Sequence, residues 1–152
     1  MPVRILLVDD HEVIRQGVRS IFRDSRPAWE ICGEAATGEE AIQAAKALAP
    51  DVVLLDITMP VMGGLEAAPH LIKLGYQVLI FTMHESETLS DEIRKAGIHG
   101  YVQKSQATRD LIFAIESVLD GGTFFGREAK LEGKQDTGLK RGPFLRTAFG
   151  FC

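Results

Sequence analysis

The feature that most constrains the fold is a short apolar run, Val52–Leu55, that ends in Asp56 and is followed at position 60 by a proline. Residues of this kind without apolar–polar alternation are typical of a parallel strand that is covered on both faces. Asp56 would then stand at the carboxyl end of a central strand, which is where open α/β sheets bind ligands. An aspartate there could instead cap a turn, so the other strand ends must decide between these interpretations.

Strand-like and helix-like segments alternate through the first 125 residues. Strand patterns cover 3–8, 29–35, 52–56, 77–82 and 100–104, and helical apolar stripes cover 11–24, 37–49, 65–74, 86–97 and 111–119. Alternation at this spacing predicts an α/β fold with a doubly wound parallel sheet of five strands and helices on both of its faces.

Two helical stripes carry specific expectations. The first helix is expected to turn one row of residues inward: Val13, Ile14, Gly17, Val18, Ile21 and Phe22. The fourth helix has only Leu89, Ile93 and Ala96 for this purpose, so we expect it to dock weakly and to be free to move.

Size and composition indicate a globular protein with one core. The 152 residues are 45% hydrophobic and 25% charged, and no apolar run approaches the ~20 residues that span a bilayer. The N-terminus does not resemble a signal peptide, so we expect a cytoplasmic location and no membrane partner. Cys32 and Cys152 suggest neither a disulfide nor a metal site.

Charge is distributed unevenly along the chain. Residues 1–125 carry 11 basic and 18 acidic side chains, whereas residues 126–152 carry six and three. The acidic part lacks the basic face that neutralises nucleic-acid phosphates. Glycines recur without periodicity from residue 126, so we expect a domain over 1–125 and a linker or irregular tail over 126–152.

Polar side chains stand at four of the five predicted strand ends. These are Asp9 and Asp10, Asp56, Thr82 and Lys104. Parallel strands would bring these groups together at one edge, where three carboxylates repel one another unless a cation binds. Oxygen ligands favour Mg²⁺, or Mn²⁺, and make zinc improbable. With a lysine and a hydroxyl opposite, the site suits phosphoryl transfer, and Asp56 is the natural nucleophile.

The sequence resembles the response-regulator receiver domains of bacterial two-component signalling. The resemblance runs from Val3 to about Phe125 and is carried by four motifs, Val8–His11, Leu54–Pro60 with Gly63 and Gly64, Phe81–His84 and Gly100–Lys104. It implies the strand order 2-1-3-4-5 of a flavodoxin-like, CheY-like three-layer sandwich. It also implies a phosphoacceptor signalling domain rather than an enzyme, with self-catalysed phosphotransfer and autodephosphorylation as its only chemistry.

The resemblance assigns roles to individual residues. Asp56 would accept a phosphoryl group from a sensor histidine kinase, and Mg²⁺ would be held by Asp9, Asp10, Asp56 and the backbone carbonyl of Thr58. Lys104 and Thr82 would contact phosphoryl oxygens. Movement of Thr82 would vacate space for Tyr101 and change the face formed by the fourth helix, the fifth strand and the fifth helix.

Within this family, Gly121–Phe125 and Thr82–His84 resemble the NarL/FixJ (LuxR-type) class, in which a helix-turn-helix domain follows the receiver. Residues 126–152 are too few for that DNA-binding module. We therefore expect either a truncated transcription regulator, which would reach DNA only through a C-terminal domain that this chain lacks, or a single-domain regulator that acts through protein contacts. A homodimer is compatible with both.

Two positions depart from the usual pattern of the family. Ser105 follows Lys104 where many receivers have proline, so no cis peptide bond is expected there. Met83 follows Thr82 where a smaller residue is commoner. We expect Met83 and His84 to screen the phosphoryl group from water, and Thr58, two residues after Asp56, to tune dephosphorylation with them.

Three other functions fit the sequence less well. A haloacid-dehalogenase-type phosphatase also uses an aspartate nucleophile with Mg²⁺, but it requires a second acid where Thr58 stands. A flavin-binding protein would need a phosphate-binding glycine-rich loop after the first strand. A degenerate receiver that only binds partners is disfavoured because every phosphorylation residue is present.

Overall fold

The computed structural model describes residues 2–83 and 87–125. Its strands form one parallel sheet with the order β2-β1-β3-β4-β5, so the predicted α/β class and strand order are confirmed. The strands are β1 (Arg4–Val8), β2 (Glu30–Ala35), β3 (Val52–Asp56), β4 (Gln77–Thr82) and β5 (Tyr101–Gln103). Because β3 lies between β1 and β4, the apolar run that ends in Asp56 is the centre of the sheet.

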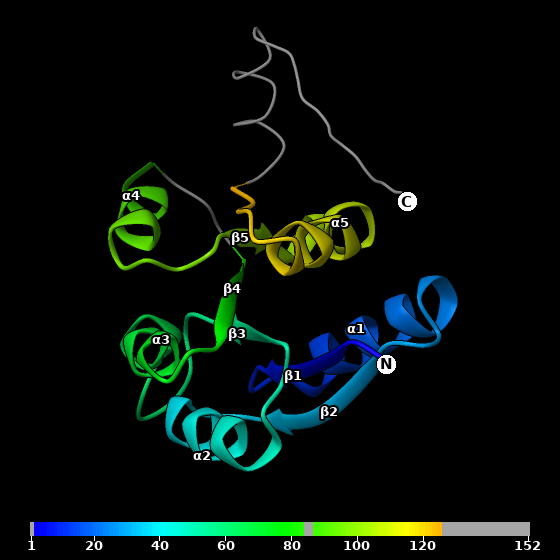
Figure 1. Cartoon of the computed structure of the whole chain (residues 1–152), viewed down its shortest axis with the longest axis horizontal. Coiled ribbons are helices and arrows are strands. Elements are labelled where there is room, and N and C mark those ends of the chain that lie inside the picture. The colour runs from blue at the N-terminus through cyan, green and yellow to red at the C-terminus, as the bar shows by residue number, and fades with distance from the viewer. Residues whose placement is uncertain (1, 84–86, 126–152) are drawn as a thin grey trace, which may run out of the picture.

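Helices cover both faces of this sheet (Figure 1). They are α1 (Glu12–Ser25), α2 (Gly38–Leu48), α3 (Gly64–Lys73), α4 (Glu87–Lys95) and α5 (Ala107–Leu119), with a short 3₁₀ helix, η1 (Lys104–Gln106), before α5. The start of α2 shows the expected capping: Thr37 Oγ1 accepts the Glu40 N–H at 3.1 Å, and Glu40 Oε1 accepts the Ala36 N–H at 2.8 Å.

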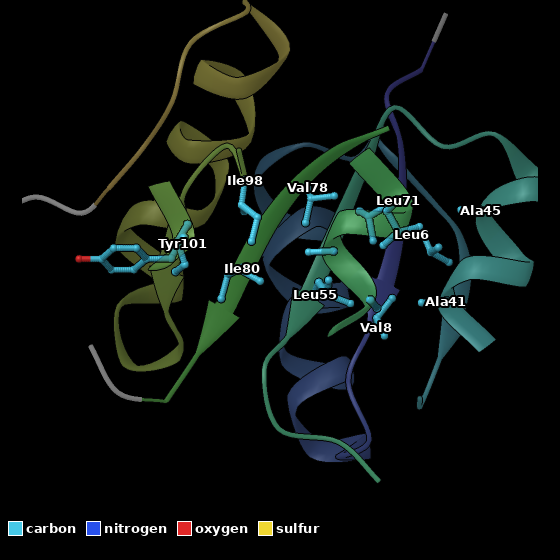
Figure 2. Packing of buried hydrophobic residues seen from close by; sticks show 14 of the residues in the cluster. Leu6, Val8, Ala41, Ala45, Leu55, Leu71, Val78, Ile80, Ile98 and Tyr101 are labelled. Atoms are coloured by element: carbon cyan, nitrogen blue, oxygen red, sulfur yellow. The ribbon is translucent and has the colours of Figure 1, made fainter. Parts of the chain in front are cut away.

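Alternating residues of the central strands divide between two apolar layers. One layer joins Leu6, Val53 and Leu55 to α2, α3 and Ile93 of α4, and part of it is drawn in Figure 2. The other joins Ile5, Leu7 and Leu54 to α1 and α5. Burial of both faces of β1, β3 and β4 explains why these strands read as continuous apolar runs. Their carboxyl ends are thereby held at one rigid edge.

The inward stripe predicted for the first helix is partly wrong. Val18 and Phe22 are buried, but Val13 is 76% exposed and Gly17 is also exposed. The reason is that Val13 and Gly17 line an open groove of about 420 Å³ between α1 and α5, with Phe81 and Lys104 among its other lining residues. Helical periodicity locates a helix's apolar face, but it does not show whether a neighbouring helix covers all of that face.

Smaller differences concern segment ends. Trp29 precedes β2 and packs its ring on Phe22 at 5.6 Å between centroids. Lys104 opens η1 rather than ending β5. In the fourth helix, Leu89 and Ile93 face inward as predicted, whereas Ala96 lies beyond the end of α4 and is exposed. Cys32 is half-buried in β2.

Other expectations have narrower outcomes. All peptide bonds in the described ranges are trans, including the one after Lys104. The irregular tail expected over 126–152 lies outside the described residues, as does Cys152. Within those same ranges, the structure contains no helix with the length and apolar character needed to cross a membrane.

Candidate functional site

Three aspartates from two neighbouring strand ends meet at the carboxyl edge of the sheet. Asp9 and Asp10 follow β1, Asp56 ends β3, and the parallel register of Val8 with Leu55 brings the two strand ends side by side. One ligand atom from each of Asp9, Asp10, His11 and Asp56 lies within 4.8 Å of the others. The side chains of Asp9 and Asp56 are buried and that of Asp10 is partly exposed. The convergence predicted from the strand ends is therefore present for the aspartates.

Lys104, which directly follows the edge strand β5, brings a positive charge into this cluster. Its Nζ lies 2.7 Å from Asp9 Oδ2 and 3.2 Å from Asp56 Oδ1, and its side chain is only 5% exposed. Lys104 follows β5, two strands away from β3, so this contact depends on the whole parallel sheet being assembled. One ammonium group is thus shared between two buried carboxylates.

His11 is a member of the cluster that the sequence interpretation used only as part of a motif. Its Nδ1 lies 3.3 Å from Asp9 Oδ1 and 3.1 Å from Asp10 Oδ1, while its backbone N–H donates to Asp9 Oδ1 at 2.9 Å. The side chain is 65% exposed. The only sequence signal was its position directly after two strand-end acids, which equally suits a residue preceding a helix.

The surroundings of Asp56 make its carboxyl group harder to ionise than an exposed one, because they raise its pKa. Burial raises the pKa of the Asp56 carboxyl, and the charge of Asp9 raises it further. Lys104 and a hydrogen bond from the Thr58 backbone oppose this rise in pKa without cancelling it. Asp56 is therefore a carboxylate whose negative charge is incompletely compensated by the protein.

The donor set fits a hard divalent cation. Asp9 Oδ2 and Asp10 Oδ1 are buried carboxylate oxygens whose near polar partners are ion-pair contacts, Lys104 Nζ at 2.7 Å from the first and His11 Nδ1 at 3.1 Å from the second. Buried carboxylate oxygens require a positive partner, and one lysine with one largely exposed histidine serves three carboxylates here. Oxygen donors in this number suit Mg²⁺ or Mn²⁺ better than zinc.

The loop between β3 and α3 is packed closely against Asp56. Gly64 donates its N–H to Ile57 O at 2.8 Å, and a side chain at Gly64 would collide with the Asp56 carbonyl group. Val61, in the same loop, is 85% exposed and has a φ of 68°, a backbone region that a β-branched residue rarely adopts. Thr58 is exposed at the start of this loop. These contacts hold the end of β3 in place.

The remaining predicted site residues lie around β4 and β5. Thr82 is the last residue of β4 and is 6% exposed. Tyr101 opens β5 beside Ile80 and is 3% exposed. Met83 is 59% exposed. His84 lies outside the described residues.

Comparison with known proteins agrees with this geometry. The sequence model of the response regulator receiver domain matches residues 5–116. The response regulator UvrY of Escherichia coli O6:H1 is 36% identical over 128 residues, which are 83% of this chain and 58% of UvrY. The response regulator GacA of Pseudomonas viridiflava is 35% identical over 121 residues, which are 78% of this chain and 56% of GacA. The chain thus spans little more than half the length of these relatives.

Solved structures show the same relationship. A LuxR-family two-component response regulator from Aurantimonas sp. SI85-9A1 superposes with a TM-score of 0.78 at 35% identity, covering 90% of this chain and 100% of that one. The response regulator domain of Thermotoga maritima CheB gives a TM-score of 0.72 at 26% identity, covering 79% and 98%. The chain therefore belongs to the response regulator receiver domain family, and its relatives are regulators of the NarL/FixJ type.

Proposed function

We propose that this receiver domain accepts a phosphoryl group on Asp56 from a phosphohistidine of a sensor histidine kinase, with Mg²⁺ held by Asp9, Asp10, Asp56 and the Thr58 carbonyl. The observation that carries the proposal is the meeting of Asp56 with Asp9, Asp10 and Lys104 at one strand edge. A structural salt bridge would need one carboxylate for one lysine. Here the ammonium group of Lys104 pairs with Asp9 and Asp56, and Asp10 adds a third carboxylate to the same cluster, which favours binding of a further cation.

In the proposed transfer, an oxygen of Asp56 attacks the phosphorus atom. A P–O bond forms, the P–N bond to the imidazole breaks, and its electron pair leaves with the imidazole ring. Lys104 Nζ, already 3.2 Å from Asp56 Oδ1, is placed to pair with a phosphoryl oxygen. Bound Mg²⁺ would supply further positive charge for the phosphoryl oxygens. The raised pKa of Asp56 means that cation binding also favours the ionised nucleophile.

Phosphorylation is proposed to act through Thr82 and Tyr101. Thr82 ends the strand next to β3, so its hydroxyl can be drawn toward a phosphoryl group on Asp56. Movement of Thr82 would open space for the ring of Tyr101, and the face formed by α4, β5 and α5 would change shape. That change would control a transcriptional output or a protein partner.

Thr58, Met83 and His84 are proposed to set the lifetime of the phosphorylated state. Thr58 is exposed two residues after Asp56, and Met83 directly follows Thr82 with most of its side chain accessible. A thioether chain over the phosphoryl group would keep hydrolytic water away. His84 contributes to this proposal through its sequence position alone.

The output of the domain has two alternatives. Relatives named as transcriptional regulators, such as DegU of Brevibacillus brevis, favour an output in which DNA is reached through a C-terminal domain. A single-domain regulator would signal through protein contacts, with or without a homodimer.

A haloacid-dehalogenase-type phosphatase is less well supported as a function of this chain, since Thr58 stands where that class of enzyme has its second acid. A cytoplasmic location stays a prediction.

The proposed function is tested by treating the protein with acetyl phosphate and Mg²⁺ and measuring its intact mass. We expect one phosphoryl group that is labile to alkali and to hydroxylamine, as an acyl phosphate is, and that is absent in EDTA and in Asp56→Asn. Asp51→Asn is the matched control, since Asp51 is an exposed acid at the opposite end of β3. Labelling that persists in Asp56→Asn would contradict the proposal, and rapid turnover of a phosphomonoester would favour the phosphatase.

A further inference from the structure

The chain that follows α5 returns along the outer edge of β5. Phe124 forms a parallel bridge with Gly100, the Tyr101 N–H donates to Phe124 O at 2.9 Å, and the Phe124 N–H donates to His99 O at 3.1 Å. Figure 1 shows this segment passing beside β5. Gly100 has a φ of 150°, and any side chain there would collide with the Phe124 backbone. The glycine therefore permits the close approach.

This pairing delivers the side chain of Phe125 to the aromatic residue assigned to the switch. The rings of Tyr101 and Phe125 lie 5.9 Å apart between centroids at 75°, an edge-to-face contact. On α4, the Arg94 guanidinium carbon lies 3.8 Å from the centroid of the same Phe125 ring. Phe125 is only 9% exposed. It is thus held between Tyr101 of β5 and Arg94 of α4.

The orientation of Tyr101 matters for this contact. Figure 2 shows its ring directed away from Ile80 and Leu55, toward the edge of the sheet. A ring that turned inward to fill space near Thr82 would leave its edge-to-face partner. Phe125 therefore stabilises one orientation of Tyr101 at the expense of the other.

We infer that Phe125, covered by Arg94, is a positioning residue that holds Tyr101 in its outward orientation, so that phosphorylation of Asp56 releases Phe125 from β5. This inference rests on the proposed function. It adds a route by which the switch reaches the segment that follows α5 and pairs with β5, rather than only the outer surface of α4 and α5.

The coupling must be reciprocal. The contact between Tyr101 and Phe125 is made in only one of the two orientations of Tyr101. Phosphorylation of Asp56 therefore disfavours this contact by the same factor by which the contact disfavours phosphorylation. Removing the Phe125 ring should therefore favour the state that phosphorylation selects. An aromatic edge contact corresponds to a change of about threefold to tenfold in such an equilibrium.

The test measures the rate of phosphorylation by acetyl phosphate in Mg²⁺, followed by intact mass. We expect Phe125→Ala and Arg94→Ala to react about threefold to tenfold faster than the parent, and Phe125→Tyr, which keeps the ring, to react at the parental rate. Leu74→Ala is the matched control and should react at the parental rate, because it shortens an exposed apolar side chain at the end of α3. Arg94 is exposed, so its variant keeps the test informative if Phe125→Ala folds poorly.

Hydrogen exchange gives a second readout that a merely structural role would not change. Phosphorylation of the parent should accelerate exchange of the Tyr101 and Phe124 amides, whose hydrogen bonds join β5 to the returning segment. A parent that phosphorylates normally, with unchanged exchange at these amides and a parental rate in both alanine variants, would overturn the inference alone. A parent that takes no phosphoryl group would instead overturn the proposed function and this inference with it.

Discussion

Lys104 lies closer to Asp9 than to the proposed phosphoacceptor: its Nζ is 2.7 Å from Asp9 Oδ2. The corresponding distance to Asp56 Oδ1 is 3.2 Å. Since Asp9 is fully buried, its charge takes a large share of the ammonium group's stabilising effect. The pKa of Asp56 is raised although a lysine stands beside it, first because the carboxyl is buried and second because of the Asp9 charge.

Neutralising Asp56 should stabilise the metal-free protein. The ordinary pKa of the carboxyl is 3.8 and the folded state raises it, first through burial and then through Asp9. Between these two pKa values the folded chain binds the proton more tightly than the unfolded chain, so the free energy of unfolding falls as the pH rises. The destabilisation is absent below the ordinary pKa and complete above the folded-state pKa.

The measurement is urea denaturation in EDTA at a series of pH values. Asp56→Asn should be more stable than the parent at pH 7, by about 1–3 kcal/mol if its desolvation resembles that of other buried polar groups. The advantage should shrink as the pH falls toward the ordinary pKa. Asp51→Asn, which neutralises an exposed acid at the other end of β3, should lack this advantage at pH 7. A constant difference between Asp56→Asn and the parent across this range would contradict the argument.

Divalent cations should stabilise the parent by binding the carboxylate cluster. A ligand that binds only the folded state contributes about 1.4 kcal/mol at ten times its Kd and about 2.7 kcal/mol at one hundred times. We expect the Tm to rise with Mg²⁺ and with Mn²⁺. Asp9→Asn and Asp10→Asn should lose most of this rise, whereas Asp51→Asn should keep it. An equal rise in all four proteins would indicate a nonspecific effect of salt.

Much of the fold and part of the site could be predicted because they depend on one rule of parallel sheets. Continuous apolar runs identified β1, β3 and β4, and carboxyl ends of parallel strands share an edge. That rule alone brings Asp9, Asp10 and Asp56 together. The strand order itself came from the resemblance to receivers.

What the sequence did not reveal depends on contacts between elements. Val13 satisfies the helical periodicity, yet the space between α1 and α5 leaves it in solvent. His11 turns back to the acids that precede it, and such a turn leaves no periodic signal. Phe125 follows the last helix in sequence, but it packs on β5 because Gly100 admits the returning chain. None of these contacts is encoded by spacing along one segment.

Replacing Val61 should relieve backbone strain in the loop beside Asp56. A β-branched residue at a φ of 68° occupies the left-handed region, which costs about 1–2 kcal/mol for residues with a Cβ atom. Asparagine tolerates this region better, so Val61→Asn should raise the free energy of unfolding by about 1 kcal/mol. The side chain is 85% exposed, and little packing is lost.

Urea denaturation of Val61→Asn and Val61→Ala measures this effect. Alanine keeps a Cβ atom and lacks the local hydrogen bonding of asparagine, so its gain should be smaller. A loss of stability in Val61→Asn would show that the valine side chain makes a compensating contact.

Shortening Met83 should shorten the life of the phosphorylated state. Met83 directly follows Thr82, the residue proposed to bind the phosphoryl group, and 59% of it is exposed, so its flexible thioether can lie over the modified Asp56. Met83→Ala would admit water, and we expect loss of phosphate to accelerate about threefold to tenfold, equivalent to a barrier lower by about 1 kcal/mol. Intact mass after removal of acetyl phosphate measures the rate. Leu74→Ala, which shortens another exposed apolar side chain at the end of α3, should match the parent. If Met83→Ala loses phosphate at the parental rate, the thioether does not shield the site and the lifetime must be set elsewhere, with Thr58 the first position to vary.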